Sequence, residues 1–198
     1  MAEQTRDLFV AAAARLFAER GYYGTSLSAV ADELDLTKQA LLHHFGTKET
    51  LYAEVLQRIS AQCMAALSAA EDAGVEPERR VQAFFSGFLA YSMDAPDDTR
   101  LILRELLDAK QSLANAEVWY LKEFLDRLTA LVRETDIWRD ATETQALSVA
   151  YQFLGSISYF AMSETTLRRM YGRASYADLA NDYPEVFETI LARCLRID

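Results

Sequence analysis

Three polar residues, Thr37, Lys38 and Gln39, stand where a short helix is predicted to begin. A threonine at such a position can accept a hydrogen bond from the backbone and so start the helix. The side chains of Lys38 and Gln39 then point outward from its first turn. A lysine amine can donate to O6 or N7 of guanine, and a glutamine amide can pair with N6 and N7 of adenine. These residue types therefore favour the reading of base edges in duplex DNA.

Groups that could bind phosphate surround this helix start. They lie at predicted helix ends and are Thr25, Ser26, His43, His44 and Lys48. Hydroxyls, amines and helix N-termini hold phosphate groups and so fix the register of a protein on a duplex. The alternative for each residue is an ordinary role, either as a helix cap or as part of a solvated helix surface.

Catalytic and metal chemistry have little support in the sequence. His43 and His44 are adjacent, so on a helix their side chains diverge by about 100°. Cys63 and Cys194 are far apart in the chain and form no CxxC pair. No nucleophile–base–orienter arrangement, glycine-rich phosphate loop or metal-binding spacing is visible. We therefore expect no enzyme activity, no metal and no cofactor.

The polar groups fall on a pair of short helices. Ser26 or Thr25 can cap the first of them, which continues through Val30 at helical spacing. Asp35 marks a tight break, and Gly46 ends the second helix. Two short helices joined by a very short turn are typical of a helix-turn-helix.

The rest of the chain indicates further helices with few breaks, because only seven Gly and three Pro occur in 198 residues. Boundaries are predicted at residues 73–77, 94–98 and 136–141, and Pro184 is predicted to open the last helix. No strand alternation is visible, so we expect an all-α fold of about nine helices. We divide it into a domain over 1–50 and a larger domain over 51–198, linked by a helix over 47–71.

Acidic residues outnumber basic ones, and the net charge is −10. Even residues 1–50 hold seven acidic and five basic side chains. This composition argues against broad, non-specific affinity for nucleic acid and predicts a shallow salt dependence for any DNA binding. No signal peptide and no apolar stretch of about 18 residues is visible, so a soluble, cytoplasmic protein is expected.

The segment from Leu16 to Leu51 resembles the N-terminal domain of the TetR/AcrR family of transcriptional repressors. The matching positions keep their order and spacing without a gap; they are Leu16-Phe17, Gly21-Tyr22, Thr25-Ser26, Val30-Ala31, Leu36-Thr37-Lys38, Ala40-Leu41, His43-His44-Phe45, Lys48-Glu49 and Leu51. Leu34-Asp35-Leu36 replaces the usual Ala-Gly-Val at the turn, where Asp35 tolerates a left-handed backbone. Leu42 replaces a tyrosine and either touches a thymine methyl group or is buried.

The resemblance implies a ligand-responsive repressor that binds a palindromic operator as a homodimer and is released by an apolar or aromatic small-molecule effector. The residues implied to contact double-stranded DNA are Thr25, Ser26, Thr37, Lys38, Gln39, Leu42, His43, His44 and Lys48. The resemblance also implies an effector cavity among the middle helices. Its candidate lining residues are Phe84, Phe88, Tyr91, Leu103, Trp119, Tyr120, Phe124, Tyr151 and Gln152.

The last two helices carry more apolar surface than one core needs, which favours a two-fold dimer. The predicted interface residues are Val149, Phe153, Ile157, Phe187, Ile190 and Leu191. A single thick monomeric core is the alternative. For the function, the alternatives are an activator, a helical interaction module of the same fold without DNA binding, and, with less support, a helical enzyme.

Overall fold

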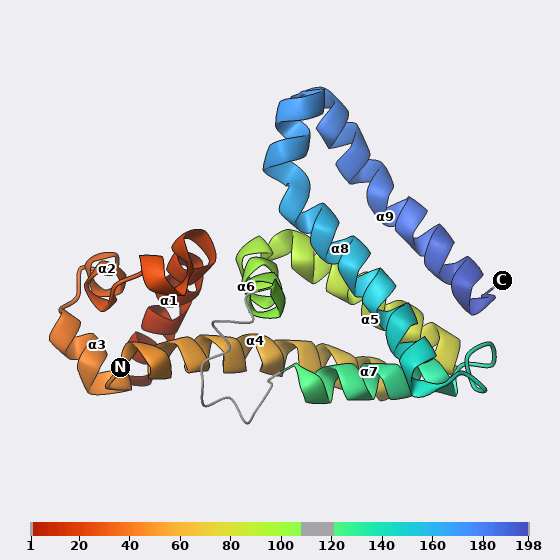
Figure 1. Cartoon of the computed structure of the whole chain (residues 1–198), viewed down its shortest axis with the longest axis horizontal. Helices are drawn as coiled ribbons and strands as arrows, with labels where there is room; N and C mark the ends of the chain where they lie inside the picture. The colour runs from red at the N-terminus through yellow and green to blue at the C-terminus, as the bar shows by residue number, and fades with distance from the viewer. Residues whose placement is uncertain (1, 108–120, 198) are drawn as a thin grey trace. The chain divides into compact units, whose positions relative to one another are not determined.

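The structure is a computed structural model that describes residues 2–107 and 121–197 (Figure 1). Within those residues it contains nine α-helices and no β-strand, as the sequence predicts. The helices are α1 (Ala2–Gly24), α2 (Leu27–Asp32), α3 (Lys38–Phe45), α4 (Lys48–Glu71), α5 (Pro77–Asp94), α6 (Pro96–Leu107), α7 (Lys122–Glu134), α8 (Glu143–Tyr171) and α9 (Arg173–Leu195). No helix in this part of the chain is both long and apolar enough to cross a bilayer.

The predicted breaks around the helix-turn-helix are confirmed by the backbone. Gly21 and Gly46 have φ of 74° and 70°, and Asp35, between α2 and α3, has φ of 55°. The left-handed conformation suits glycine and is tolerated by aspartate, which explains why the turn survives without a glycine. Thr37 caps α3, since its Oγ1 accepts a hydrogen bond from the Ala40 N–H at 3.1 Å.

The described residues divide into two compact units. One consists of residues 2–61 and 97–107, and the other of residues 62–96 and 121–197. The first unit therefore includes α6, which the sequence analysis placed in the larger domain. Periodicity could not reveal this, because α6 packs on α1 and α4 through contacts that span 40 to 86 residues of sequence.

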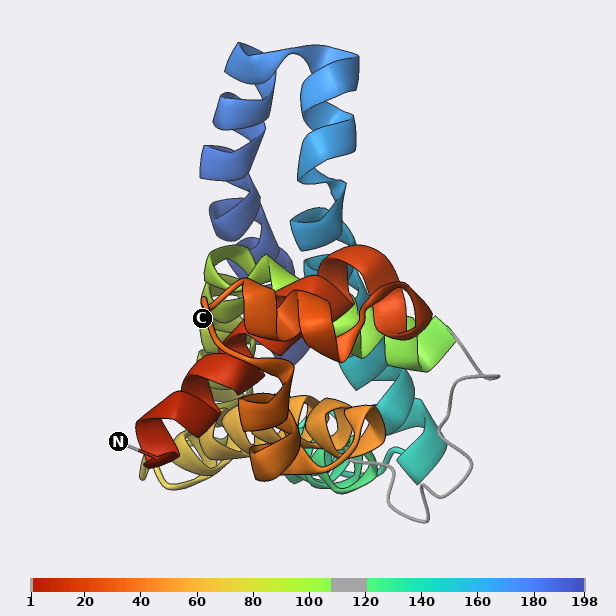
Figure 2. The same ribbon diagram turned by 90° about the vertical axis from the view of Figure 1, so that its left-hand side faces the viewer.

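The core of the first unit joins α1, α3 and α4. Phe9 lies edge-on to Phe45 with ring centroids 6.2 Å apart, and Phe17 lies edge-on to Tyr52 at 4.9 Å. These side chains are buried. The short helix α3 is too small to be stable alone, so burial of the Phe45 ring against Phe9 is what fixes its position. Figure 2 shows the ribbons of α2 and α3, in orange, beside α1.

The second unit is built on contacts among α5, α7, α8 and α9. Its core is rich in aromatic rings, and Phe85 contacts Phe153, which in turn contacts Phe187. The N-terminus of α8 carries a capping box between Thr142 and Gln145. At the other end of α8 the chain reverses at Gly172, so that α8 and α9 form an antiparallel hairpin (Figure 1).

The prediction that Pro184 opens the last helix is wrong. Pro184 lies inside α9, which begins at Arg173. The ring of Tyr183 stacks on Phe160 of α8 with centroids 3.7 Å apart, and its hydroxyl donates to the Ser156 carbonyl at 2.9 Å. These contacts hold α9 against α8 on the N-terminal side of the proline, where the missing backbone N–H removes one helical hydrogen bond.

Candidate nucleic-acid interface

The helix α3 has a polar outward face and an apolar inward face. Leu41 and Phe45 are buried. Rotation by about 100° per residue places the exposed side chains on the opposite side; they are Lys38, Gln39, Leu42 and His43. Leu42 is 36% exposed on this outward face, which decides between the two alternatives for it in favour of exposure.

The prediction for the Thr25 side chain is wrong. Thr25 is 2% exposed, and its hydroxyl is shared between the carbonyls of Leu16 and Gly21, each 3.0 Å away. It therefore faces α1 rather than a phosphate. Ser26 is the actual cap of α2, because its Oγ accepts a hydrogen bond from the Ala29 N–H at 3.0 Å. Ser26 is exposed and stays a candidate for phosphate contact.

Replacing Thr25 by valine is expected to lower the free energy of unfolding by about 1–3 kcal/mol, because the buried Leu16 carbonyl and the partly buried Gly21 carbonyl lose a donor while the side-chain volume is kept. Thr25→Ser keeps the hydroxyl and serves as the control, with a smaller loss. Urea denaturation of both variants measures the difference. A valine variant as stable as the wild type would contradict the role given to this hydroxyl.

The two adjacent histidines have different surroundings. His43 is exposed on the outward face of α3. His44 is half-buried, and its ring lies 5.9 Å from that of Phe9. Of the pair, His43 is therefore the better placed to meet a phosphate, while His44 contributes to packing between α1 and α3.

Lys48, at the first position of α4, lies against an aromatic ring that the sequence analysis did not single out as functional. Its Nζ is 4.3 Å from the ring centroid of Tyr22. The Tyr22 hydroxyl donates to Glu49 Oε1 at 2.6 Å. Burial lowers the pKa of Lys48 against the opposing effect of Glu49, and the hydrogen bond from Tyr22 lowers the pKa of Glu49.

The cations of the first unit divide into paired and unpaired groups. Each arginine in the first 50 residues lies in an ion pair with a carboxylate; the pairs are Arg6–Glu54, Arg15–Glu33 and Arg20–Glu19. Neither Lys38 nor Lys48 takes part in an ion pair of the described residues. The charges of the three arginines are thus largely offset by their carboxylate partners. The net charge of residues 1–50 therefore does not show that two lysines remain outside these ion pairs.

The helix α6 is tied to α1 and α4 by polar contacts. Arg104 Nε donates to the Ala18 carbonyl near the end of α1 at 3.2 Å. The Tyr52 hydroxyl of α4 donates to Glu105, and Arg58 of α4 pairs with Asp98 at 2.8 Å. The helices α1 and α4 are thus in contact with an element that directly follows α5 in the chain.

The predicted effector residues do not form one group. Phe84, Phe88 and Phe124 do lie together, with Phe84 5.9 Å from Phe88 and 5.7 Å from Phe124 between ring centroids. Tyr91 joins this cluster at 6.5 Å from Phe88. Leu103 belongs to the other compact unit. Trp119 and Tyr120 lie outside the described residues.

Tyr151 and Gln152 do not line an internal cavity in this structure, because both are exposed on α8.

The residues predicted to form the dimer interface would have to be exposed on the protomer, but most of them are not. Five of these six side chains are buried in the protomer's own core, namely Val149, Phe153, Ile157, Phe187 and Leu191. Ile190 alone of the six is exposed. Helical periodicity correctly indicated an apolar stripe on each of the two helices. This stripe packs into the core of the protomer and is not free to contact a second copy.

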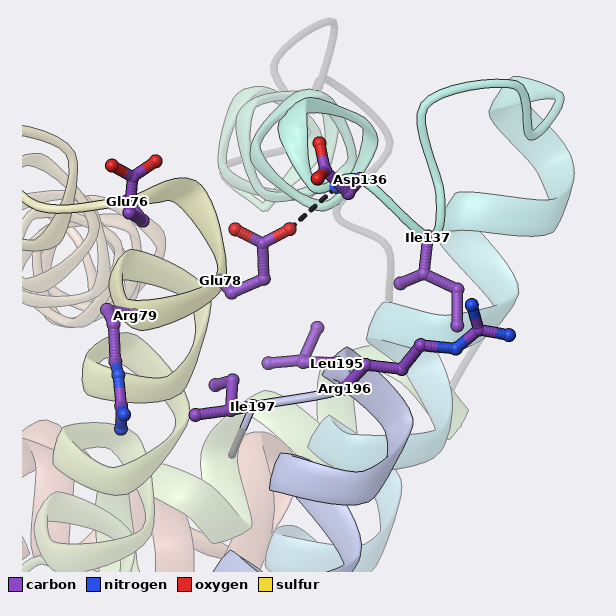
Figure 3. A pocket seen from close by; sticks show the side chains of 8 residues that line it. All are labelled: Glu76, Glu78, Arg79, Asp136, Ile137, Leu195, Arg196 and Ile197. Carbon is purple, nitrogen blue, oxygen red and sulfur yellow. Dashed lines mark hydrogen bonds between the residues drawn. The ribbon is translucent and has the colours of Figure 1, made fainter.

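A pocket of about 430 Å³ opens in the second unit at the beginning of α5 (Figure 3). Its charged lining comes from Glu76, Glu78, Arg79, Asp136 and Arg196, and its apolar lining from Ile137, Leu195 and Ile197. Figure 3 shows the Glu78 carboxylate turned toward Asp136. Glu78 Oε1 accepts a hydrogen bond from the Asp136 backbone N–H at 2.6 Å. None of the predicted effector residues lines this pocket, and its charged walls differ from an apolar ligand site.

Comparisons with known proteins agree with the helix-turn-helix geometry. Residues 9–55 match the family described as bacterial regulatory proteins, tetR family. The HTH-type transcriptional regulator RutR of Escherichia coli (strain K12) is 30% identical over 127 residues, which cover 64% of this chain and 59% of RutR. The HTH-type transcriptional repressor DhaR of Mycobacterium sp. (strain GP1) is 31% identical over 85 residues, 42% of this chain and 43% of DhaR.

The matched region therefore spans less than two thirds of these curated relatives. The fold is similar over the whole chain to that of a TetR-like transcriptional regulator from Rhodococcus sp. RHA1, with a TM-score of 0.65, 21% identity, and coverage of 100% of this chain and 97% of the other. The family match falls on the helix-turn-helix described above, and the fold agreement extends to the helices beyond it. The N-terminal helix-turn-helix of this chain thus matches the tetR family of bacterial regulatory proteins over residues 9–55, and the fold of the chain is that of a TetR-like regulator.

Proposed function

We propose that this protein is a cytoplasmic transcriptional repressor that binds a palindromic operator as a homodimer and leaves it when a small-molecule effector binds. The observation that carries the proposal is the outward face of α3, where Lys38, Gln39, Leu42 and His43 are exposed together. In a helix-turn-helix the second helix enters the major groove with its N-terminal residues on the base edges. Among the relatives, DhaR is named as a transcriptional repressor.

In this proposal Lys38 and Gln39 read bases and Leu42 meets a thymine methyl group. The Ser26, Thr37, His43 and Lys48 side chains hold phosphates, with His44 behind them. An imidazolium at His43 is a better phosphate partner than a neutral ring. The protein acts by binding and not by catalysis.

The proposed dimer uses the exposed faces of α8 and α9. Tyr151 and Tyr159 are exposed on α8 at a spacing of about two turns, and Gly155 between them leaves room for close approach. Val186 and Ile190 are exposed one turn apart on α9. A two-fold pairing of these faces would give two copies of α3 for the two halves of a palindrome.

The proposed effector site lies in the second unit beside the cluster of Phe84, Phe88, Phe124 and Tyr91, which favours an apolar or aromatic ligand. The ligand can change operator affinity only through its different affinity for the two states of the protein. The proposed route from this unit includes α6 as well as α4, because α6 follows α5 directly and contacts α1 and α4.

Substitution of Lys38 or Lys48 by alanine is expected to weaken binding to the DNA upstream of the protein's own gene. Loss of the base contact at Lys38 costs about 1–3 kcal/mol per protomer, roughly five- to 150-fold in Kd for each half-site. The loss at Lys48 is smaller and sequence-independent. With one lysine–phosphate contact per protomer, at Lys48, a dimer has a slope of log K against log salt of about −2.

Fluorescence anisotropy with labelled upstream DNA measures both quantities. Lys122→Ala on α7, where Lys122 pairs with Asp126, is the matched control and is expected to leave binding unchanged. A wild-type protein without specific binding to this DNA, or equal behaviour of all three variants, would contradict the proposal. A slope near −10 would contradict the small number of phosphate contacts.

A further inference from the structure

We infer that Tyr22 is a positioning residue of the DNA interface, whose ring holds the Lys48 ammonium group and whose hydroxyl holds the Glu49 carboxylate. The inference rests on the proposed function, because it assigns Lys48 to a DNA phosphate. Tyr22 itself does not touch DNA. It acts by fixing a cation and an anion that are adjacent in the chain at the beginning of α4.

The ring of Tyr22 is a rigid platform. Tyr22 is 8% exposed, and its ring is stacked on Phe17 at 6.0 Å and lies edge-on to Tyr52 at 5.0 Å between centroids. Lys48 Nζ lies 4.3 Å from the centroid of this ring, well within the range of a cation–π contact. A lysine side chain has high rotamer entropy, so a contact that restricts it before binding reduces the loss of freedom when a phosphate is bound.

The hydroxyl of Tyr22 fixes the position of the carboxylate next to Lys48. Glu49 is exposed and follows Lys48 directly, so a loose carboxylate there could pair with the Lys48 ammonium or repel a phosphate. The hydrogen bond of 2.6 Å from the Tyr22 hydroxyl to Glu49 Oε1 fixes the carboxylate instead. One residue thereby keeps the cation ordered and the neighbouring anion tethered.

Tyr22→Leu and Tyr22→Phe separate the ring from the hydroxyl. Tyr22→Leu is expected to weaken DNA binding roughly two- to fivefold per lysine, and to reduce the magnitude of the salt slope by up to about 0.9 per lysine. Tyr22→Phe keeps the ring and is expected to retain most of the affinity. In a Lys48→Ala background, Tyr22→Leu is expected to cause no further loss.

A purely structural role would give a different result. If Tyr22→Leu weakens binding equally in the wild-type and Lys48→Ala backgrounds, the ring does not act through Lys48 and the inference is overturned. The same holds if Tyr22→Phe loses as much affinity as Tyr22→Leu. Circular dichroism melting confirms that each compared variant is folded, and Tyr22→Phe provides the test if Tyr22→Leu does not fold.

A second measurement needs no DNA. Reductive methylation with ¹³C-formaldehyde keeps the lysine charge and labels each ammonium group for NMR, and Lys48→Arg assigns the Lys48 signal. We expect a ring-current shift at Lys48 that disappears in Tyr22→Leu and remains in Tyr22→Phe. An unshifted Lys48 signal overturns the inference even if the protein binds DNA. A shifted signal in a protein that binds no specific DNA overturns the proposed function, and with it the role of the contact in DNA binding.

Discussion

Charging the exposed face of α9 is expected to convert the proposed dimer into a folded monomer that has lost its operator. Val186 and Ile190 are 54% and 55% exposed and lie four residues apart, so they share one face of the helix. In a two-fold interface both protomers use the same patch, so each substitution enters the interface twice. A Val186→Glu/Ile190→Glu protein would therefore bring four carboxylates together in a surface that excludes water.

The expected effects are a halving of the molecular mass in analytical ultracentrifugation and a loss of operator affinity of at least about a hundredfold, because each half-site would then bind alone. Val75→Glu, at an apolar residue that is also exposed, is the control and should remain dimeric. An unchanged dimer in the double variant would place the interface elsewhere.

A substitution in the buried stripe of α8 is expected to affect folding instead of dimerisation. Ile157 was predicted from sequence to meet a partner, but it is fully buried in the protomer. Ile157→Ala should therefore reduce the free energy of unfolding rather than the strength of association. The distinction between Ile157 and Ile190 follows from burial alone, since both are isoleucines on apolar stripes of long helices.

These two isoleucines show what helical periodicity can predict and what it cannot. Helical periodicity correctly predicted long helices and an apolar surplus in the last two. It could not say which stripe packs inward, because that depends on the contacts of α8 and α9 with each other and with α5. The aromatic candidates Tyr151 and Phe153 illustrate the same point: they are two residues apart, and one is exposed while the other is buried.

At the candidate site, local signals were sufficient for some residues and insufficient for others. Thr37, Asp35 and Gly46 could be placed because caps and left-handed turns are encoded within a few residues. The roles of Thr25 and Tyr22 depend on contacts with Leu16 and Lys48, which no local pattern specifies. Both residues belonged to the motif, so the motif identified their importance without identifying their chemistry.

The contact between α6 and α4 leads to the second large expected effect. The Arg58–Asp98 pair is partly buried, with 34% of the Arg58 side chain and 10% of the Asp98 side chain exposed. Arg58 Nε has no hydrogen-bond partner among the described residues, so the guanidinium depends on Asp98. Loss of one partner of a fully buried pair costs about 3–5 kcal/mol, and the exposure of Arg58 reduces the expectation to about 2 kcal/mol.

Asp98→Ala is therefore expected to lower the free energy of unfolding by about 2 kcal/mol in urea denaturation and to raise hydrogen exchange in α6. Asp97→Ala is the matched control, because Asp97 also lies in the first turn of α6 but pairs with Arg100 of the same helix. The favourable interaction of a carboxylate with the helix N-terminus is lost in both variants, so their difference isolates the contact with α4. Since α6 follows α5 without a long connection, release of α6 should also weaken the response of operator affinity to any effector that acts on the second unit. Equal stability of the two variants would show that α6 is held on α4 by apolar packing alone, and the signal would then have to pass through α4 itself.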